Sequence, residues 1–287
     1  MKAPFKKINV QFNELVNVCV LSDVHLGAKY CNKTALRRAI ERAKDQNSRI
    51  IILGDFFDLI LPKDMKRYDP SQIDPEIVND PQPVNTIVDM ACEYLSEVKE
   101  NIDVIITGNH EWEVQKRHGV NPIMMLLDSL YGREREDGAP AYHFGYDGFF
   151  RYILEEPKGL SGAWDIYTRH GSTGAAPMTE GMLEMKRTMM AYHADIYLAG
   201  HNHCTNSFTN RIVGVSQSGY MFSKQVYALR CGTFLDSEIE HGAKGISYPK
   251  KGGFAFPVIG AAQFQLGISR NKGKLEKTTN ISMGGTI

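Results

Sequence analysis

The chain has 287 residues, and its 33 Lys and Arg residues are balanced by 33 Asp and Glu residues. This length is ample for a buried core, and 43% hydrophobic with 23% charged residues is a globular composition, which excludes a disordered chain. The formal net charge of zero excludes the broad basic character of proteins that coat nucleic acid, but it does not exclude a small local site.

No apolar run reaches the roughly 18–20 residues that a membrane-spanning helix needs. The basic segment 1–7 is followed by polar residues rather than by the apolar segment of a signal peptide. The five cysteines are scattered and form no C-x-x-C motif. We therefore expect a reduced, cytoplasmic protein with no membrane partner.

Strand-like and helix-like segments alternate over the first two-thirds of the chain. Short apolar runs predict strands, and apolar residues at helical spacing predict helices. The predicted strands are 16–21, 49–53, 103–106, 164–168 and 195–199, and the predicted helices are 34–43, 84–98 and a stretch around 178–192. This alternation predicts an α/β core with parallel strands and helices packed on the sheet.

The last third of the chain has a different pattern. Short β-like runs at 211–215, 225–230 and 257–266 predict a β-rich C-terminal part. Two stretches predict loops: 62–83 contains five of the twelve prolines, and 241–253 contains four glycines and a proline. We expect one domain over residues 1–287.

Metal-ligand residue types follow five of the predicted strands. The clusters are Asp23-Val-His25, Gly54-Asp55-Phe-Phe-Asp58, Gly108-Asn109-His110-Glu111, Arg169-His170-Gly171 and Gly200-His201-Asn-His203. The carboxyl ends of parallel strands share one edge of a sheet, so these clusters are expected to converge. Residues two apart in extended backbone point to the same side, so Asp23 with His25, and His201 with His203, can each grip one metal or divide between two.

These residue types suit a pair of divalent cations. Asp55 has two carboxylate oxygens that can bridge two ions, and Asn109 adds a neutral oxygen ligand. Mixed oxygen and imidazole ligands favour Mn, Fe or Zn over Ca or Mg, and we expect Mn first. A structural zinc site is excluded, since such sites use closed sets of Cys and His. Two divalent cations would outweigh the carboxylates of Asp23 and Asp55 and leave the centre positive.

The ordered motifs Asp-x-His, Gly-Asp-x-x-Asp, Gly-Asn-His-Glu, His-Gly and Gly-His-x-His resemble those of the calcineurin-like metallophosphoesterase superfamily. The resemblance implies a four-layer α/β/β/α sandwich. It further implies that one metal is held by Asp23, His25, Asp55 and His203, and the second by Asp55, Asn109, His170 and His201.

The expected chemistry is two-metal phosphoester hydrolysis, in which a hydroxide bridging the cations attacks phosphorus in line. The family motif places His110 beside the metals, where it would donate a proton to the leaving oxygen. Asp58 would bind His110 and keep it charged and oriented.

The residues around the motifs distinguish branches of the superfamily. Leu26 and Leu59 replace residues typical of the serine/threonine phosphatases, which argues against that branch. Asp-x-His-Leu-Gly and Gly-Asp-Phe-Phe-Asp are similar to the SbcD-like DNA-repair exonucleases. His110 argues against the UDP-diacylglucosamine pyrophosphatases, which normally carry Arg there. We therefore expect a phosphodiesterase whose substrate partner is a nucleic acid or a nucleotide.

Two alternatives stay open at this stage. One is a phosphatase or pyrophosphatase of a small nucleotide or lipid-linked phosphate, and the other is a metal-binding phosphoesterase-fold module with little turnover. Lys250, Lys251 and the 62–83 loop, which begins close to Asp58, are candidate substrate contacts. Strand alternation points Arg169 away from the metals. For Glu111 a favourable interaction with a helix dipole is a sufficient explanation.

Overall fold

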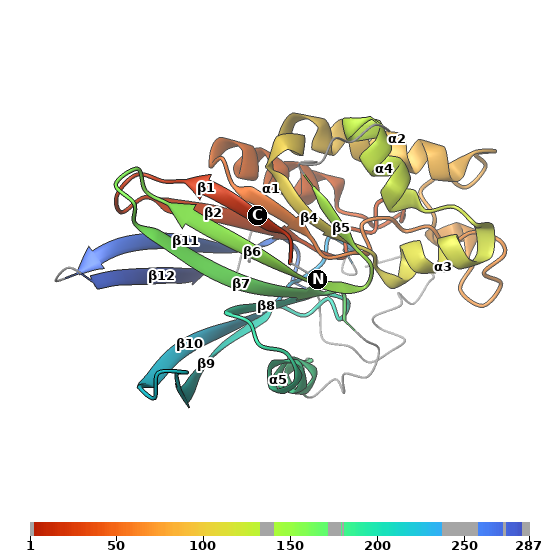
Figure 1. The fold of residues 1–287 in the computed structure, drawn as a ribbon. Helices are drawn as coiled ribbons and strands as arrows, with labels where there is room; N and C mark the ends of the chain where they lie inside the picture. The colour runs from red at the N-terminus through yellow and green to blue at the C-terminus, as the bar shows by residue number, and fades with distance from the viewer. Residues whose placement is uncertain are drawn as a thin grey trace.

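The computed structural model describes residues 3–132, 141–171, 179, 181–236, 258–271 and 274–282. They form two six-stranded mixed sheets (Figure 1). The first sheet has the order β12 (Lys274–Ser282), β11 (Ala262–Asn271), β2 (Leu15–Leu21), β3 (Arg49–Ile52), β4 (Ile102–Ile106) and β5 (Tyr142–Phe144). The second has the order β1 (Phe5–Asn9), β6 (Asp147–Glu155), β7 (Ser161–Arg169), β8 (Ile196–Ala199), β10 (Met221–Arg230) and β9 (Asn206–Val215).

The strands that precede the predicted metal ligands are parallel within each sheet. In the first sheet β2 pairs with β3 and β3 pairs with β4, each in parallel. In the second sheet β7 pairs with β8 in the same way. Each sheet therefore presents the carboxyl ends of its ligand-bearing strands at one edge.

A buried apolar layer joins the inner faces of the two sheets. The first sheet contributes Val20, Ile51 and Val104 to it, and the second contributes Trp164 and Ile166. β3 is buried on both faces, because Ile50 and Ile52 belong to the core under the helices. This explains why its sequence is a continuous run of isoleucines rather than an alternation.

Helices cover the outer faces of both sheets. Helices α1 (Lys33–Asp45), α2 (Pro83–Leu95) and α4 (Pro122–Tyr131) pack on the first sheet, and α5 (Met182–Ala191) packs on the second (Figure 1). The predicted four-layer α/β/β/α sandwich is thus confirmed. The short helix α3 (Asn109–His118) begins directly after the loop that follows β4.

Most of the predicted elements are confirmed, with some differences. α2 ends at Leu95 and continues as a 3₁₀ helix over Ser96–Asn101, so the predicted helix is too long at its carboxyl end. The loop at 62–83 contains no α-helix before Pro83, as its prolines predict, although Pro70–Gln72 forms one 3₁₀ turn. The 241–253 stretch lies outside the described residues. Among the described helices, none combines the length and the hydropathy that crossing a bilayer requires.

The layer between the sheets predicts a large effect for Ile51. This side chain is fully buried, so Ile51→Ala should lower the free energy of unfolding by roughly 2–5 kcal/mol through lost transfer energy and a residual cavity. Val213→Ala, at a side chain that is 61% exposed, should change it by less than about 0.5 kcal/mol. Urea unfolding monitored by circular dichroism measures both, and equal losses would contradict the assignment of this core.

Candidate metal centre

The predicted ligands converge at the edge where the two sheets meet. Asp23, Asp55 and Asn109 follow β2, β3 and β4 of the first sheet, while His170 and the His201–His203 loop follow β7 and β8 of the second. The backbone N–H of His201 donates to Asp23 Oδ2 at 2.8 Å and so joins the two sheets. The expectation that the clusters share the edge of a single sheet is therefore wrong, because the ligands come from two facing sheets.

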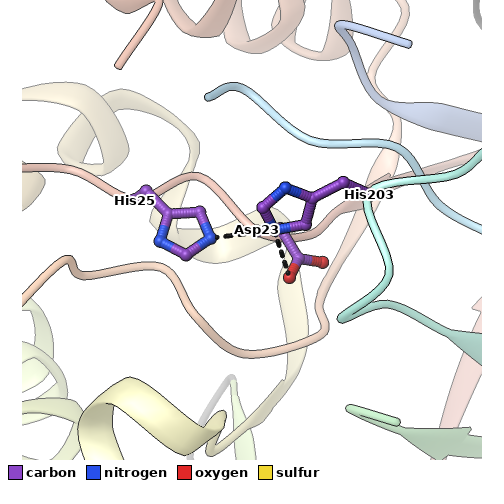
Figure 2. Close-up of side chains that lie close together, drawn as sticks. All are labelled: Asp23, His25 and His203. Carbon is purple, nitrogen blue, oxygen red and sulfur yellow. Dashed lines mark hydrogen bonds and ion pairs between the residues drawn. The ribbon is translucent and has the colours of Figure 1, made fainter. Parts of the chain in front are cut away.

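One group of ligand atoms is formed by Asp23, His25 and His203 (Figure 2). His25 Nε2 lies 3.1 Å from His203 Nε2, and His203 Nε2 lies 3.4 Å from Asp23 Oδ1. Two imidazole nitrogens that face each other at this distance need a proton or a cation between them. The group contains three of the four residues that the resemblance assigns to the first metal.

A second group is formed by Asp55, His170 and His201. His170 Nε2 lies 3.1 Å from Asp55 Oδ2, 3.1 Å from Asn109 Oδ1 and 3.3 Å from His201 Nδ1. All four residues that the resemblance assigns to the second metal therefore meet around one ring nitrogen.

His110 and Asp58 lie beside these groups and in contact with each other. His110 Nδ1 is 2.7 Å from Asp58 Oδ1, and His110 Nε2 is 4.0 Å from Asp55 Oδ2. A third group of candidate ligand atoms comprises His25, Asp55 and His110. The structure thus brings the predicted catalytic pair together and also places His110 within reach of a metal.

The backbone at the ligands differs from the predicted extended conformation. Asp23, His25, Asp55, His201 and His203 all have positive φ, between 46° and 73°, in the left-handed region. They are five of the seven non-glycine residues with positive φ in the described part of the chain. This conformation costs about 1–2 kcal/mol per residue. The two-residue spacing therefore brings Asp23 and His25 together through tight turns and not through strand alternation, while His201 and His203 fall into different ligand groups.

The buried charges at the centre shift one another's pKa values. Burial opposes ionisation of Asp23, but contact with His203 and the charge of His170 outweigh it and lower the pKa of Asp23 to about 2. Burial lowers the pKa of His170, but the carboxylate of Asp55 raises it more strongly, to about 10. Burial and the charge of His170 together lower the pKa of His201 to about 4. Divalent metals bind anionic carboxylates and neutral imidazoles, so Asp23 and His201 are in the binding form, whereas a cation at His170 would displace its proton.

Two further observations fit these residues to metal ions. Asp23 Oδ1 is buried, and its contact with His203 Nε2 is long, at 3.4 Å; a buried anionic oxygen held this weakly is costly unless a cation pairs with it. In addition, two imidazoles are oriented through their Nδ1 atoms: that of His170 lies 2.7 Å from the Leu53 carbonyl, and that of His25 lies 3.4 Å from Asp58. Metal-binding histidines are held in this manner by an outer acceptor.

Glu111 is a site residue whose role the sequence analysis missed. Its buried carboxylate accepts the backbone N–H groups of Gly108 at 2.8 Å, Asp55 at 3.1 Å and Phe57 at 3.0 Å. A helix dipole is therefore an insufficient explanation, since Glu111 ties the loop after β3 to the loop after β4. Burial and the charge of Asp55 raise the pKa of Glu111 to about 7. The position of Glu111 in the first turn of α3 was the available signal, but its partners on another loop were not visible in the sequence.

The loop that Glu111 holds also requires a glycine at position 108. A Cβ at Gly108 would overlap with the backbone nitrogen and the carboxylate of Asp55. The glycine therefore allows the two loops to approach closely enough for the backbone N–H of His110 to donate to Asp55 Oδ1 at 2.9 Å. The orientation of the Asp55 carboxylate is thus fixed by the chain around it.

This arrangement predicts that Glu111→Gln destabilises the metal-free protein. The amide would present a donor to buried N–H groups that now have a carboxylate acceptor, and an unsatisfied buried donor costs about 1–3 kcal/mol. Glu113→Gln, on the same helix but in a surface pair with Arg117, should cost less than about 1 kcal/mol. Urea unfolding after chelation measures the difference, and similar values for the two variants would argue against the proposed tie between the loops.

The other candidate contacts are placed as follows. Arg169 points away from the candidate ligand groups and contacts α5, through Glu184 at 3.2 Å, as strand alternation predicts. The 62–83 loop lies against the turn after His25, where Asp74 donates its backbone N–H to the Gly27 carbonyl at 2.9 Å. Lys250 and Lys251 lie outside the described residues.

Comparisons with known proteins were made for the sequence and for the fold. The model of the calcineurin-like phosphoesterase family matches residues 16–205. A search of curated protein sequences gave no match. The resemblance to the SbcD-like branch gains no support from these comparisons.

Several solved structures are similar to this chain at low sequence identity. Zn²⁺-bound wild-type Vps29 from Entamoeba histolytica is 11% identical, with 93% of this chain and 99% of that chain covered and a TM-score of 0.34. GAP50, described as the anchor in the inner membrane complex of Plasmodium, is 12% identical, with coverages of 93% and 89% and a TM-score of 0.44. A metallophosphoesterase from Sphaerobacter thermophilus is 16% identical, with coverages of 77% and 78% and a TM-score of 0.32.

The family assignment rests on the sequence match, which spans about two-thirds of the chain and includes all seven predicted ligands. The sandwich fold and the convergence of His and Asp side chains at the strand ends agree with it. The chain belongs to the calcineurin-like phosphoesterase family.

Proposed function

We propose that this protein is a dinuclear metal-dependent phosphodiesterase. The observation that carries the proposal is the presence of two ligand groups within one small centre, Asp23–His25–His203 and Asp55–His170–His201, each of which combines residues from both sheets. The first would hold one cation with help from Asp55, and the second would hold another with help from Asn109. When bound, two divalent cations would supply positive charge for the phosphoryl oxygens and an activated water.

The protein's own contribution to the reaction would be proton transfer by His110. Burial lowers its pKa, but the charge of Asp55 and the contact with Asp58 outweigh burial and raise the pKa to about 9. The imidazole is then protonated at neutral pH, with Nδ1 facing Asp58 and Nε2 available to an oxygen leaving group. Asp58 also lies 3.4 Å from His25 Nδ1, so one carboxylate orients both a ligand and the proposed acid.

For the substrate we propose a phosphodiester of a nucleic acid or nucleotide. The support is the sequence similarity of Leu26-Gly27 and Phe57-Asp58 to the nuclease branch. The zero net charge argues for a compact substrate contact and against a long nucleic-acid track. Manganese is the proposed metal, with iron or zinc as alternatives, on the basis of the mixed carboxylate, amide and imidazole ligands.

The test is a substrate panel with defined metal content. Protein stripped by a chelator and reloaded with Mn²⁺, Fe²⁺ or Zn²⁺ is assayed on bis-p-nitrophenyl phosphate, a thymidine dinucleotide, single-stranded DNA and p-nitrophenyl phosphate. We expect metal-dependent hydrolysis of the diesters and little of the monoester. Preferential hydrolysis of the monoester, or of a nucleoside diphosphate, would point instead to a phosphatase or pyrophosphatase.

A second candidate function is a metal-binding module with little turnover. The observation that favours it is the third ligand group, in which His110 lies within metal reach together with His25 and Asp55. A metal bound by His110 would remove the proposed proton donor. This candidate predicts two metals per chain, measured by elemental analysis, with no hydrolysis of any substrate in the panel above that of the chelated protein.

A further inference from the structure

Arg230, the last residue of β10, is a buried cation outside the group of predicted metal ligands. Only 1% of the residue is exposed. Its Nη1 donates to the carbonyl of Gly200 at 2.8 Å, and its Nη2 donates to the carbonyl of Gly181 at 3.2 Å and to Glu184 Oε2 at 2.8 Å. The guanidinium thus joins the end of β10, the start of α5 and the loop after β8.

The loop that Arg230 holds carries two of the predicted ligands. Gly200 directly precedes His201, whose backbone is in the left-handed conformation with φ of 73°. The Gly200 carbonyl bonded to Arg230 belongs to the peptide that His201 completes, and the N–H of that same peptide donates to Asp23 Oδ2. One peptide group is therefore fixed on one side by a buried cation and on the other by a metal-binding carboxylate.

A second arginine makes the corresponding link from the neighbouring strand. Arg169 directly precedes the ligand His170, and its guanidinium lies 3.2 Å from Glu184 Oε1 and donates to Thr188 Oγ1 at 3.1 Å. Each carboxylate oxygen of Glu184 thus forms an ion pair with one arginine. Both arginines are adjacent, through the backbone or through one hydrogen bond, to the histidines of the Asp55–His170–His201 group.

The packing around Arg230 makes room for this arrangement. Gly181, at the amino end of α5, has φ of 76°, and a Cβ there would overlap with the guanidinium of Arg230. Burying a cation is costly even when it is paired, so hydrophobic residues would hold α5 on the sheet at least as well. The arrangement is better explained by the directional hydrogen bonds that only a guanidinium supplies at this position.

We infer that Arg169, Glu184 and Arg230 form a clamp through which α5 positions His170 and His201 for one of the two cations. The three are positioning residues, since none of them belongs to the ligand groups. The inference rests on the proposed metal centre, but not on its hydrolytic activity. It predicts that loss of the clamp lowers the affinity of the Asp55–His170–His201 group for its cation more than that of the Asp23–His25–His203 group.

The test is a Co²⁺ titration of the metal-free full-length protein, followed through the visible absorption of the bound ion. Wild type should bind two ions. Arg230→Met should bind one with wild-type affinity and the other roughly 10–100-fold more weakly, as is typical when a group that orients a ligand is removed, with a changed absorption band. Arg230→Lys, which keeps a donor for the Gly200 carbonyl, should restore part of both the affinity and the band.

The matched control is Arg49→Met. Arg49 also pairs with a buried carboxylate, Asp103, with Nε 2.8 Å from Oδ2, but it lies at the opposite end of β3 from the metal centre. Its loss should lower the melting temperature without changing Co²⁺ affinity or absorption. If Arg230→Met lowers only the melting temperature and retains both Co²⁺ sites, the inference is wrong and Arg230 is merely structural.

Glu184→Gln is a milder variant that keeps the test valid where Arg230→Met does not fold. It removes the charge that both arginines share and should weaken the same single Co²⁺ site, and an unchanged titration contradicts the inference. Failure of the proposed function is a separate result. A wild type that binds two Co²⁺ ions but hydrolyses no diester contradicts the function and leaves the clamp supported by its own titration, whereas a wild type that binds no Co²⁺ contradicts both.

Discussion

Replacing Asp55 with asparagine is expected to lower kcat/KM for bis-p-nitrophenyl phosphate by roughly 10²–10⁴-fold. Asp55 belongs to the Asp55–His170–His201 group and also groups with His25, a residue of the other cation's set, so in the proposed centre its loss affects both cations. A bound cation would supply several kcal/mol of transition-state charge stabilisation, and each 1.4 kcal/mol corresponds to a factor of ten in rate. We expect at most one Mn²⁺ per chain by elemental analysis, and a smaller rise in melting temperature when MnCl₂ is added.

The control for this variant is Asp89→Asn, an exposed carboxylate on α2. It should retain two metals, full activity and the same response of the melting temperature to MnCl₂. Two tightly bound metals in Asp55→Asn would show that Asp55 is not shared between the sites. Lost activity in that variant would then need another explanation, such as the hydrogen bond between the Asp55 carboxylate and the backbone of His110.

The second large effect is expected for His110→Ala. General acid catalysis contributes about 10²–10⁴-fold, and its contribution grows as the leaving group becomes more basic. The variant should therefore lose about this factor on a thymidine dinucleotide and much less on bis-p-nitrophenyl phosphate, since p-nitrophenolate leaves without a proton. Metal content should stay at two per chain, because proton transfer and ligation are separate roles in the proposed mechanism.

His193→Ala is the matched control for this measurement, since His193 is exposed between α5 and β8. It should leave both substrates unaffected. If His110→Ala instead loses a metal and slows both substrates equally, His110 is a ligand in the group with His25 and Asp55, which would favour the metal-binding module.

The sequence predicts the centre of the fold well because the decisive strands are buried on both sides. β2, β3, β4 and β8 are nearly continuous apolar runs, and such runs are visible without knowledge of their neighbours. The ligands follow these strands directly, so those of the first sheet meet at its edge once the strands are parallel, and docking of the second sheet adds His201 and His203. The division of these residues into two metal-ligand sets came instead from the resemblance to the phosphoesterase family.

The outer strands were missed because their sequences carry a weaker signal. β5 has only three residues, and β12 reads Lys-Leu-Glu-Lys-Thr-Thr-Asn-Ile-Ser, which is largely polar and forms a strand by pairing with β11. α4 was also missed, although Asn121 caps its first turn and Pro122 stands at its first position, where proline is favoured. These elements depend on tertiary neighbours or on signals that lie outside hydrophobic periodicity.

The backbone of the ligands could not be predicted for a different reason. Left-handed conformations of Asp23 and His25 are opposed by local sterics and persist only because distant groups hold them. The N–H of Asp23 donates to the Gly54 carbonyl at 3.1 Å, and that of His25 donates to the Asp55 carbonyl at 3.0 Å. Such pairings join separate strands, so no window of local sequence contains them.

Because the ligands come from two sheets, the candidate metal centre is complete only after the two sheets have docked. Asp23 and His201 are 178 positions apart in the chain and meet only after both sheets have formed and docked. A nascent chain that ends after β5 holds Asp23, Asp55 and Asn109 but none of the histidines that follow β7 and β8, and its first sheet still lacks β11 and β12. In the proposed centre, metal binding would therefore come last, and a chain that held both ions would have docked its two sheets correctly.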